Sequence, residues 1–188
     1  MFKSANNYTF EARAREVLAT VSLMWFAMLV VICFFKVVGL ASVDFSHDMP
    51  ILGVSANYLL QSNELTVNQA LTSPFVVMGI LITVIGAPLA EEILFRWFIC
   101  RSCASDVRGN LRPGGVGLGI VLVGSFILFG IAHGQGYFSL MIQGVGGLLL
   151  ARLFFRNGPD LKSAYFSCVA AHGLYNTSIV LVSWIWLS

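Results

Sequence analysis

Charge is what this sequence has little of. Only 11% of its 188 residues are charged, whereas an average soluble domain has about 25%. Hydrophobic residues make up 57% of the chain, and the mean hydropathy is +0.83. A soluble fold of this length could not bury so much apolar surface. The composition therefore excludes a soluble protein and predicts an integral membrane protein.

Several familiar site signatures are also missing. The zinc-protease motif HExxH is absent, and Cys100-x-x-Cys103 has no second half that would complete a zinc site. No aspartate lies inside an apolar run, which excludes the paired aspartates of aspartyl intramembrane proteases. Gly124-Ser125 does not supply the GxSx pattern of a rhomboid protease. The chain has no internal repeat, which disfavours a transporter.

Five apolar runs are each close to the roughly 20 residues that a helix needs to cross the hydrocarbon. They lie at about 17–40, 71–95, 116–135, 137–155 and 164–187. The sequence thus predicts an all-α fold, a polytopic transmembrane helical bundle of about five spans, with 1–188 as a single membrane domain. Loop 41–70 has room for a short interfacial helix.

Basic residues indicate how the bundle is oriented. Apart from Lys36 and Arg96, lysine and arginine occur in three segments, 1–16, 101–112 and 152–162, and loop 41–70 has none. With five spans, all three basic segments fall on one side of the membrane. By the positive-inside rule that side is the cytoplasm, so we expect a cytoplasmic N-terminus in a cell membrane.

Strongly polar groups within the later spans are few, and each has a high cost at membrane depth. Glu92 and Arg96 are four residues apart on one helical face, so they can form an ion pair. Glu91 is rotated about 100° from Glu92 and is left without a local partner. The main polar groups in these spans are Glu91, Glu92, Arg96, His133, His172 and Asn176.

A single histidine within a membrane is more often a packing residue than a catalyst. Two histidines, one amide and a spare carboxylate on three separate spans instead favour convergence on one polar cavity. There Glu91 would draw a proton from water, while His133, His172 and Asn176 would stabilise an oxyanion.

Three motifs carry a resemblance to a known family. EEILFR fits EExxxR, FGIAH fits FxxxH and HGLYN fits HxxxN, in that order and on separate spans. In this the chain resembles the CPBP family of intramembrane proteases over roughly residues 70–180. That family includes the type II CAAX prenyl endopeptidases and the Abi-type bacteriocin-immunity proteins.

The resemblance implies a role for each residue. Glu91 would be the general base with His133 beside it, His172 and Asn176 the oxyanion-stabilising pair, and Glu92 and Arg96 the structural support. A metal-independent mechanism without a cofactor is favoured. If a metal such as zinc is used, its ligands would be Glu91, His133 and His172.

One geometric conflict accompanies this assignment. With the predicted span limits, ideal straight helices would separate Glu91 and His133 by roughly 20 Å in depth. Helix tilt, Pro88 or the glycines near 114–119 would have to close part of that distance.

The expected function is an intramembrane endopeptidase that cleaves a membrane-associated peptide or protein near its C-terminus or near a membrane-embedded segment. The expected surroundings are the lipid bilayer, with no nucleic acid, and small size favours a bacterial member without prenylated substrates. The alternative is a non-enzymatic membrane immunity or assembly factor that retains the bundle. A small transporter with a proton-coupled glutamate ranks third.

Overall fold

Helices make up all the regular structure in the part of the chain that the computed structural model describes, namely residues 9–38, 74–104, 115–133, 136–157 and 160–187. The all-α expectation is confirmed. The interfacial helix considered for 41–70 lies outside the described residues. The elements are α1 (Phe10–Val37), α5 (Pro74–Leu81), η2 (Ile82–Gly86), α6 (Ala87–Glu92), η3 (Ile93–Cys100), α7 (Arg101–Ala104), α8 (Gly115–Ala132), α9 (Gly136–Arg156) and α10 (Leu161–Leu187).

Three helices of the described ranges are long and apolar enough to cross a membrane: Phe10–Val37, Val76–Cys100 and Leu161–Val182. They correspond to the first, second and fifth predicted spans. The third is the shorter apolar helix Gly117–Ala132. The fourth predicted span, α9, is not among the helices that are long and apolar enough to cross a membrane. Because α9 packs against α1, α8 and α10, it needs less hydropathy than a helix surrounded by lipid.

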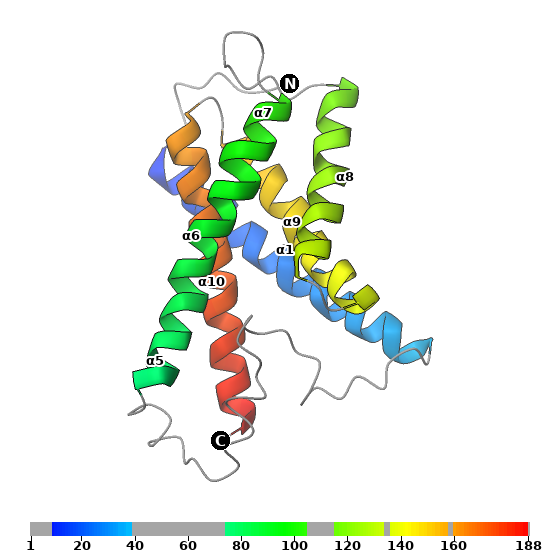
Figure 1. Cartoon of the computed structure of the whole chain (residues 1–188), viewed down its shortest axis with the longest axis vertical. Helices are drawn as coiled ribbons and strands as arrows, with labels where there is room; N and C mark the ends of the chain where they lie inside the picture. The colour runs from blue at the N-terminus through cyan, green and yellow to red at the C-terminus, as the bar shows by residue number, and fades with distance from the viewer. Residues whose placement is uncertain (1–8, 39–73, 105–114, 134–135, 158–159, 188) are drawn as a thin grey trace.

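The elements α5 to α7 follow one another as a nearly continuous rod along the long axis of the molecule (Figure 1). α10 lies along this rod and contacts η2, α6 and η3. α8 begins at the same end as α7 and ends near the middle of the rod (Figure 1). This arrangement brings the C-terminal end of α8 to the level of α6.

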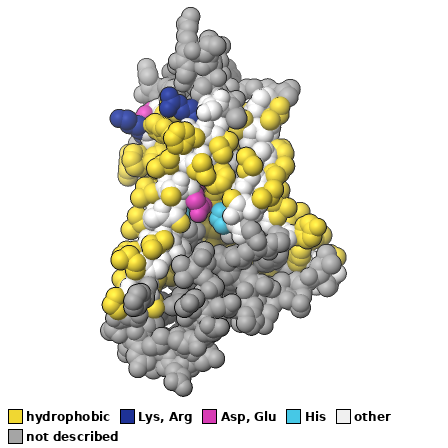
Figure 2. Space-filling view, viewed as in Figure 1, with side chains coloured by type: hydrophobic (Ala, Val, Ile, Leu, Met, Phe, Trp, Pro, Cys, Tyr) yellow, Lys and Arg dark blue, Asp and Glu magenta, His cyan; other side chains and the backbone are white. Residues whose placement is uncertain are grey.

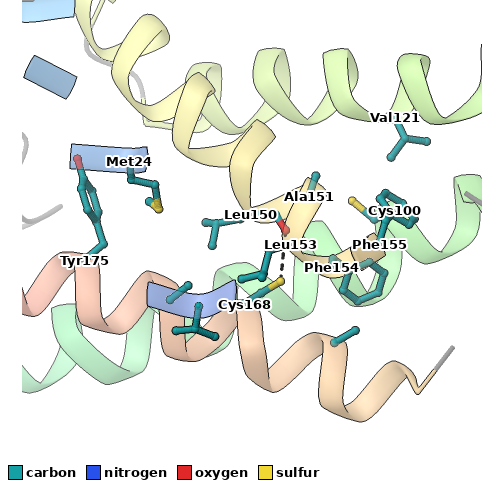
Figure 3. Packing of buried hydrophobic residues seen from close by; sticks show 13 residues of the cluster. Met24, Cys100, Val121, Leu150, Ala151, Leu153, Phe154, Phe155, Cys168 and Tyr175 are labelled. Atoms are coloured by element: carbon teal, nitrogen blue, oxygen red, sulfur yellow. Dashed lines mark hydrogen bonds between the residues drawn. The ribbon is translucent and has the colours of Figure 1, made fainter. Parts of the chain in front are cut away.

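The apolar core lies where α9 meets α10 and α1. Leu150 and Phe154 of α9 are fully buried, as is Cys168 of α10, whose thiol donates to the Leu150 carbonyl oxygen at 3.3 Å (Figure 3). Met24 of α1 and Tyr175 of α10 extend the same cluster. The core therefore fixes α9 and α10 relative to each other behind the rod.

Glycines allow α8 and α9 to approach closely, as their small size favours in membrane helices. A Cβ atom on Gly144 would lie 2.8 Å from the Phe126 carbonyl oxygen, and one on Gly147 would lie 2.5 Å from the Phe129 Cβ. Both separations are too short for any larger residue. The two glycines therefore determine where α8, and His133 at its end, can lie.

Polar contacts hold one end of the bundle together. Arg156 lies 3.0 Å from Glu16, and Arg13 donates to Ser163 at 2.6 Å. Ser163 in turn donates to Asp160, and this hydrogen bond holds the pKa of the Asp160 carboxyl below its usual value. The contacts join the start of α1, the end of α9 and the start of α10, so basic residues from the first and third basic segments meet at one end of the bundle.

Candidate active site

The ion pair between Glu92 and Arg96 forms the buried base of the site. Nε of Arg96 lies 2.9 Å from Oε2 of Glu92, and neither side chain is exposed (0% each). The structure therefore contains the pair that the i,i+4 spacing predicts. Removal of either partner would leave the other charge buried and uncompensated.

Arg96 also connects the rod to its neighbours. Its Nη1 donates to Ser125 Oγ of α8 at 2.7 Å, and Ser125 donates to the Gly147 carbonyl oxygen of α9 at 3.1 Å. The guanidinium carbon lies 5.4 Å from the centre of the Phe129 ring, within cation–π range. The position of Arg96 is thus fixed by three helices.

The second oxygen of Glu92 orients His172. Nδ1 of His172 lies 3.0 Å from Oε1 of Glu92, and the imidazole is buried. A carboxylate accepts hydrogen bonds, so we assign the Nδ1 hydrogen to this contact. The ring is thereby held with Nε2 directed toward Glu91, 3.9 Å from its Oε2.

His133 is held in an equivalent way from the other side. Its Nδ1 lies 2.7 Å from the Phe129 carbonyl oxygen, which can only accept, so this nitrogen carries the hydrogen. Nε2 then faces Glu91 at 3.6 Å from Oε2. The Phe129 ring lies 4.6 Å from the His133 ring and 5.7 Å from the His172 ring, so one aromatic side chain supports both imidazoles.

Glu91 therefore lies between two imidazoles that both present Nε2. Its Oε2 is shielded from solvent and has no hydrogen-bond partner within the described residues, whereas the side chain as a whole is 28% exposed. Figure 2 shows an acidic and a histidine side chain next to each other on the surface at mid-height, with hydrophobic side chains above them. A carboxylate in this position can accept a proton from a molecule that enters at the surface.

The predicted depth separation of Glu91 and His133 was wrong, and the reason is the limit given to the second span. That span was ended at residue 95, before Arg96, but the rod continues to Ala104 because Arg96 is buried and paired. At 1.5 Å per residue, Glu91 lies about 20 Å from the end of the rod and His133 about 27 Å from the start of α8. The longer rod leaves about 7 Å of the expected 20 Å, and the 3.6 Å contact between the two side chains shows that the residues lie at similar depth.

Asn176 lies one turn after His172 on α10, but its amide contacts a different element. Its Nδ2 donates to the Thr83 carbonyl oxygen in η2 at 3.0 Å, and the side chain is half-buried. An amide nitrogen carries two hydrogens, so this contact uses one of them. Of the four residues expected to converge, the structure brings Glu91, His133 and His172 together and holds Asn176 beside them through Thr83.

Two residues of the site were missed from the sequence. Ser125 was considered only as a nucleophile, and its contact with Arg96 joins residues 29 positions apart, which no spacing rule reaches. Thr83 contributes a backbone atom, so its side chain gave no signal. Pro88 was the available clue, because a proline inside a helix removes a donor from one backbone carbonyl.

A carboxylate and two imidazoles form a donor set that zinc can use. Donors at 2.0–2.2 Å from one tetrahedral zinc would lie roughly 3.4 Å apart at ideal angles; the Glu91–His133 distance of 3.6 Å is close to this value, and the Glu91–His172 distance of 3.9 Å exceeds it. Within the described ranges, no group of three or more His, Cys, Asp or Glu side chains is arranged to hold a metal ion. The residues as placed therefore do not fit a bound metal.

Comparison with known proteins identifies the family. The family model described as "Type II CAAX prenyl endopeptidase Rce1-like" matches residues 73–178, more than half of the chain. No curated protein and no solved structure gives a match. The match includes all three motifs and confirms the resemblance inferred from them. It covers α5 to α9 and most of α10, the elements that form the site. The chain thus belongs to the type II CAAX prenyl endopeptidase Rce1-like family of intramembrane CAAX-type proteases.

Proposed function

We propose that this protein is an intramembrane endopeptidase in which Glu91 activates water for attack on a peptide bond. The observation that carries the proposal is the position of Glu91 Oε2, unpartnered in the described part of the chain and 3.6 and 3.9 Å from two imidazole Nε2 atoms. Both imidazoles are fixed through Nδ1 by acceptors that do not take part in the reaction. Such fixed groups favour a preorganised catalytic site.

In the proposed reaction a water molecule donates one hydrogen bond to Glu91 and one to Nε2 of His133. Glu91 takes a proton from this water while the water oxygen forms a bond to the scissile carbonyl carbon. His172, whose Nε2 faces Glu91, and the second amide hydrogen of Asn176 stabilise the oxyanion that forms. The C–N bond then breaks as Glu91 returns the proton to the leaving amine.

The proposed substrate is a membrane-associated peptide or protein, cleaved near its C-terminus or near a membrane-embedded segment. Exposed apolar side chains on the elements beside the site support this choice. Leu94 of η3 is 53% exposed and Ile131 of α8 is 63% exposed. A chain segment held in lipid would reach Glu91 across such a surface, whereas a soluble peptide would have to leave water. The bacterial inner or plasma membrane is the proposed location, with the N-terminus in the cytoplasm.

The test compares the purified protein with its Glu91→Gln variant in liposomes. Two probes are used, a peptide with a farnesylated CAAX terminus and an unprenylated peptide with one transmembrane segment. Glutamine keeps the shape of the side chain but cannot act as a base, so the cleavage rate should fall by roughly 10²–10⁴-fold. Folding should be unchanged, because Glu91 has no structural hydrogen bond within the described residues.

Glu11→Gln is the matched control, because it removes one carboxylate at an exposed site far from the chemistry. If the protein is instead a non-enzymatic immunity or assembly factor, Glu91→Gln should leave the cellular phenotype intact. Equal cleavage of either probe by wild type and Glu91→Gln would exclude the glutamate mechanism.

The proposed mechanism uses no metal, so cleavage should survive strong chelators. The measurement is the rate of the wild-type protein before and after 1,10-phenanthroline, together with the zinc content of the purified protein. Loss of activity with the chelator and its return with added zinc would contradict the proposal. Glu91, His133 and His172 would then have to act as metal ligands in a rearranged site.

A further inference from the structure

The carbonyl oxygen of Thr83 lies in a segment where the helical hydrogen bonds are shifted. In η2 the Ala87 N–H donates to the Ile82 carbonyl oxygen, five residues back, instead of to Thr83. In the same register the next donor, at residue 88, would serve the Thr83 carbonyl oxygen. Residue 88 is proline, which has no N–H. The sequence thus removes the backbone donor that this register would supply.

Asn176 of α10 provides a hydrogen at this point. Its Nδ2 lies 3.0 Å from the Thr83 carbonyl oxygen. Three residues earlier, a Cβ atom on Gly173 would lie 2.9 Å from the Val84 carbonyl oxygen, so α10 approaches η2 as closely as a glycine allows. Asn176 and Gly173 therefore face two successive carbonyls of the same shifted turn.

The location gives this contact a consequence for the site. Pro88 lies three residues before Glu91, and Asn176 lies four residues after His172, about one turn away in each case. The contact itself is made to Thr83, so it fixes η2, which continues directly into α6, against α10. It lies about two turns before Glu91 and one turn after His172, the two groups whose separation is 3.9 Å. Backbone carbonyls in hydrocarbon require a hydrogen-bond donor from within the protein, so the contact cannot be replaced by solvent.

We propose that Asn176 is a positioning residue whose amide replaces the backbone N–H that Pro88 lacks, and so holds Glu91 and His172 at their working separation. This role rests on the proposed function and is additional to the hydrogen bond that Asn176 offers to the oxyanion. The shifted turn, the proline and the asparagine then form one unit, which we call the Pro88–Asn176 clasp, defined by Thr83, Pro88 and Asn176.

A double-mutant comparison tests the clasp. Pro88→Ala restores a backbone N–H, and Thr83 then gains a donor in either register, from residue 88 in the shifted one or from Ala87 in the regular α-helical one. Asn176→Ala should therefore lower the melting temperature in the wild-type background and change it little in the Pro88→Ala background. It should also lower kcat by roughly ten- to a hundredfold with KM unchanged, and by clearly less when Pro88→Ala is present.

Equal losses of melting temperature and kcat in both backgrounds would overturn the clasp and leave Asn176 with the oxyanion role alone. The melting-temperature comparison needs no substrate, so it still decides the matter if Glu91→Gln shows that the proposed function is wrong. Asn157→Ala is the matched control, because the Asn157 amide also donates to a backbone carbonyl, that of Leu153, but this bond closes the C-terminal end of α9 and joins no second helix. Its effect should be the same with and without Pro88→Ala.

If Pro88→Ala does not fold, Asn176→Leu replaces it as the second variant. Leucine keeps the approximate size of the side chain but has no donor for the Thr83 carbonyl oxygen, so it should lower the melting temperature. A wild-type melting temperature for Asn176→Leu would overturn the proposal.

Discussion

Two glutamate–arginine pairs in this protein have the same spacing along a helix and nearly the same length. Glu11 and Arg15 of α1 lie 2.8 Å apart with side chains 75% and 78% exposed. Glu92 and Arg96 lie 2.9 Å apart and are not exposed at all. The two pairs thus share their spacing and length, and their surroundings differ. An exposed pair of this kind contributes little, whereas breaking a buried one leaves a charge that solvent cannot reach.

The two regions also differ in what else their carboxylates contact. The carboxylate of Glu11 pairs with Arg15 on its own helix, whereas Glu92 and Arg96 contact His172 of α10 and Ser125 of α8. The buried pair is therefore a connection between helices. Glu92 pairs with Arg96 and contacts His172, whereas the neighbouring Glu91 makes no structural ion pair with an arginine or lysine in the described part of the chain. A single 100° step along the helix separates a carboxylate that holds the fold from one that is available for chemistry.

The largest effect is expected when the buried pair is broken. Glu92→Ala leaves Arg96 charged and uncompensated, so the free energy of unfolding should fall by about 3–5 kcal/mol. The measurement is the yield of folded protein in the membrane and its denaturant midpoint in detergent. Glu91→Ala is the adjacent control and should leave both nearly unchanged while it abolishes cleavage.

A double variant separates the cost of an unpaired buried charge from the loss of the contact between Glu92 and His172. In the double variant Glu92→Ala/Arg96→Met no charge remains buried, so part of the lost stability should return. Cleavage should stay low, because His172 has lost the carboxylate that orients it. If Glu91→Ala and Glu92→Ala reduced activity equally at equal protein level, the division of labour between the two glutamates would be wrong.

An intermediate effect is expected where α8 packs closely against Gly147 of α9. A methyl group on Gly147 would lie 2.5 Å from the Phe129 Cβ and 2.9 Å from the Ser125 carbonyl oxygen. Gly147→Ala should therefore move α8, lower the free energy of unfolding by about 1–3 kcal/mol and reduce cleavage through His133. Gly124→Ala is the control on α8, because its methyl group would meet nothing within 4 Å. Equal stability of the two variants would show that α8 is not held at Gly147.

Much of this site follows from spacing along one helix. The Glu92–Arg96 pair and the separation of Glu91 from it follow from the 3.6-residue period, and the placement of Phe129 beside His133 follows from the same rule. The helical class follows from composition. These features are local, so the sequence contains all the information that they need.

The convergence of Glu91, His133 and His172 was expected from the cost of polar groups at membrane depth, but the individual hydrogen bonds between helices could not be predicted in this way. Treating Arg96 as the end of a span placed Glu91 at the wrong depth, because hydropathy alone cannot reveal that an arginine is buried against Glu92 and Ser125. The bond from Asn176 to Thr83 depends on a shifted helical register, which sequence periodicity does not show. The sequence therefore did not predict the depth of Glu91 or the Asn176–Thr83 hydrogen bond.

The smallest effect is expected at the exposed pair, and it completes the comparison. Glu11→Gln breaks a 2.8 Å contact with the same spacing as Glu92–Arg96. Since both groups are exposed and can be hydrated separately, the free energy of unfolding should change by no more than about 0.5 kcal/mol. Cleavage of either peptide should be unchanged, and added salt should remove the small difference that remains. The denaturant midpoints of wild type, Glu11→Gln and Glu92→Ala at two salt concentrations provide the measurement. A loss for Glu11→Gln comparable to that of Glu92→Ala would mean that the pair itself, rather than its burial, accounts for the stability of this bundle.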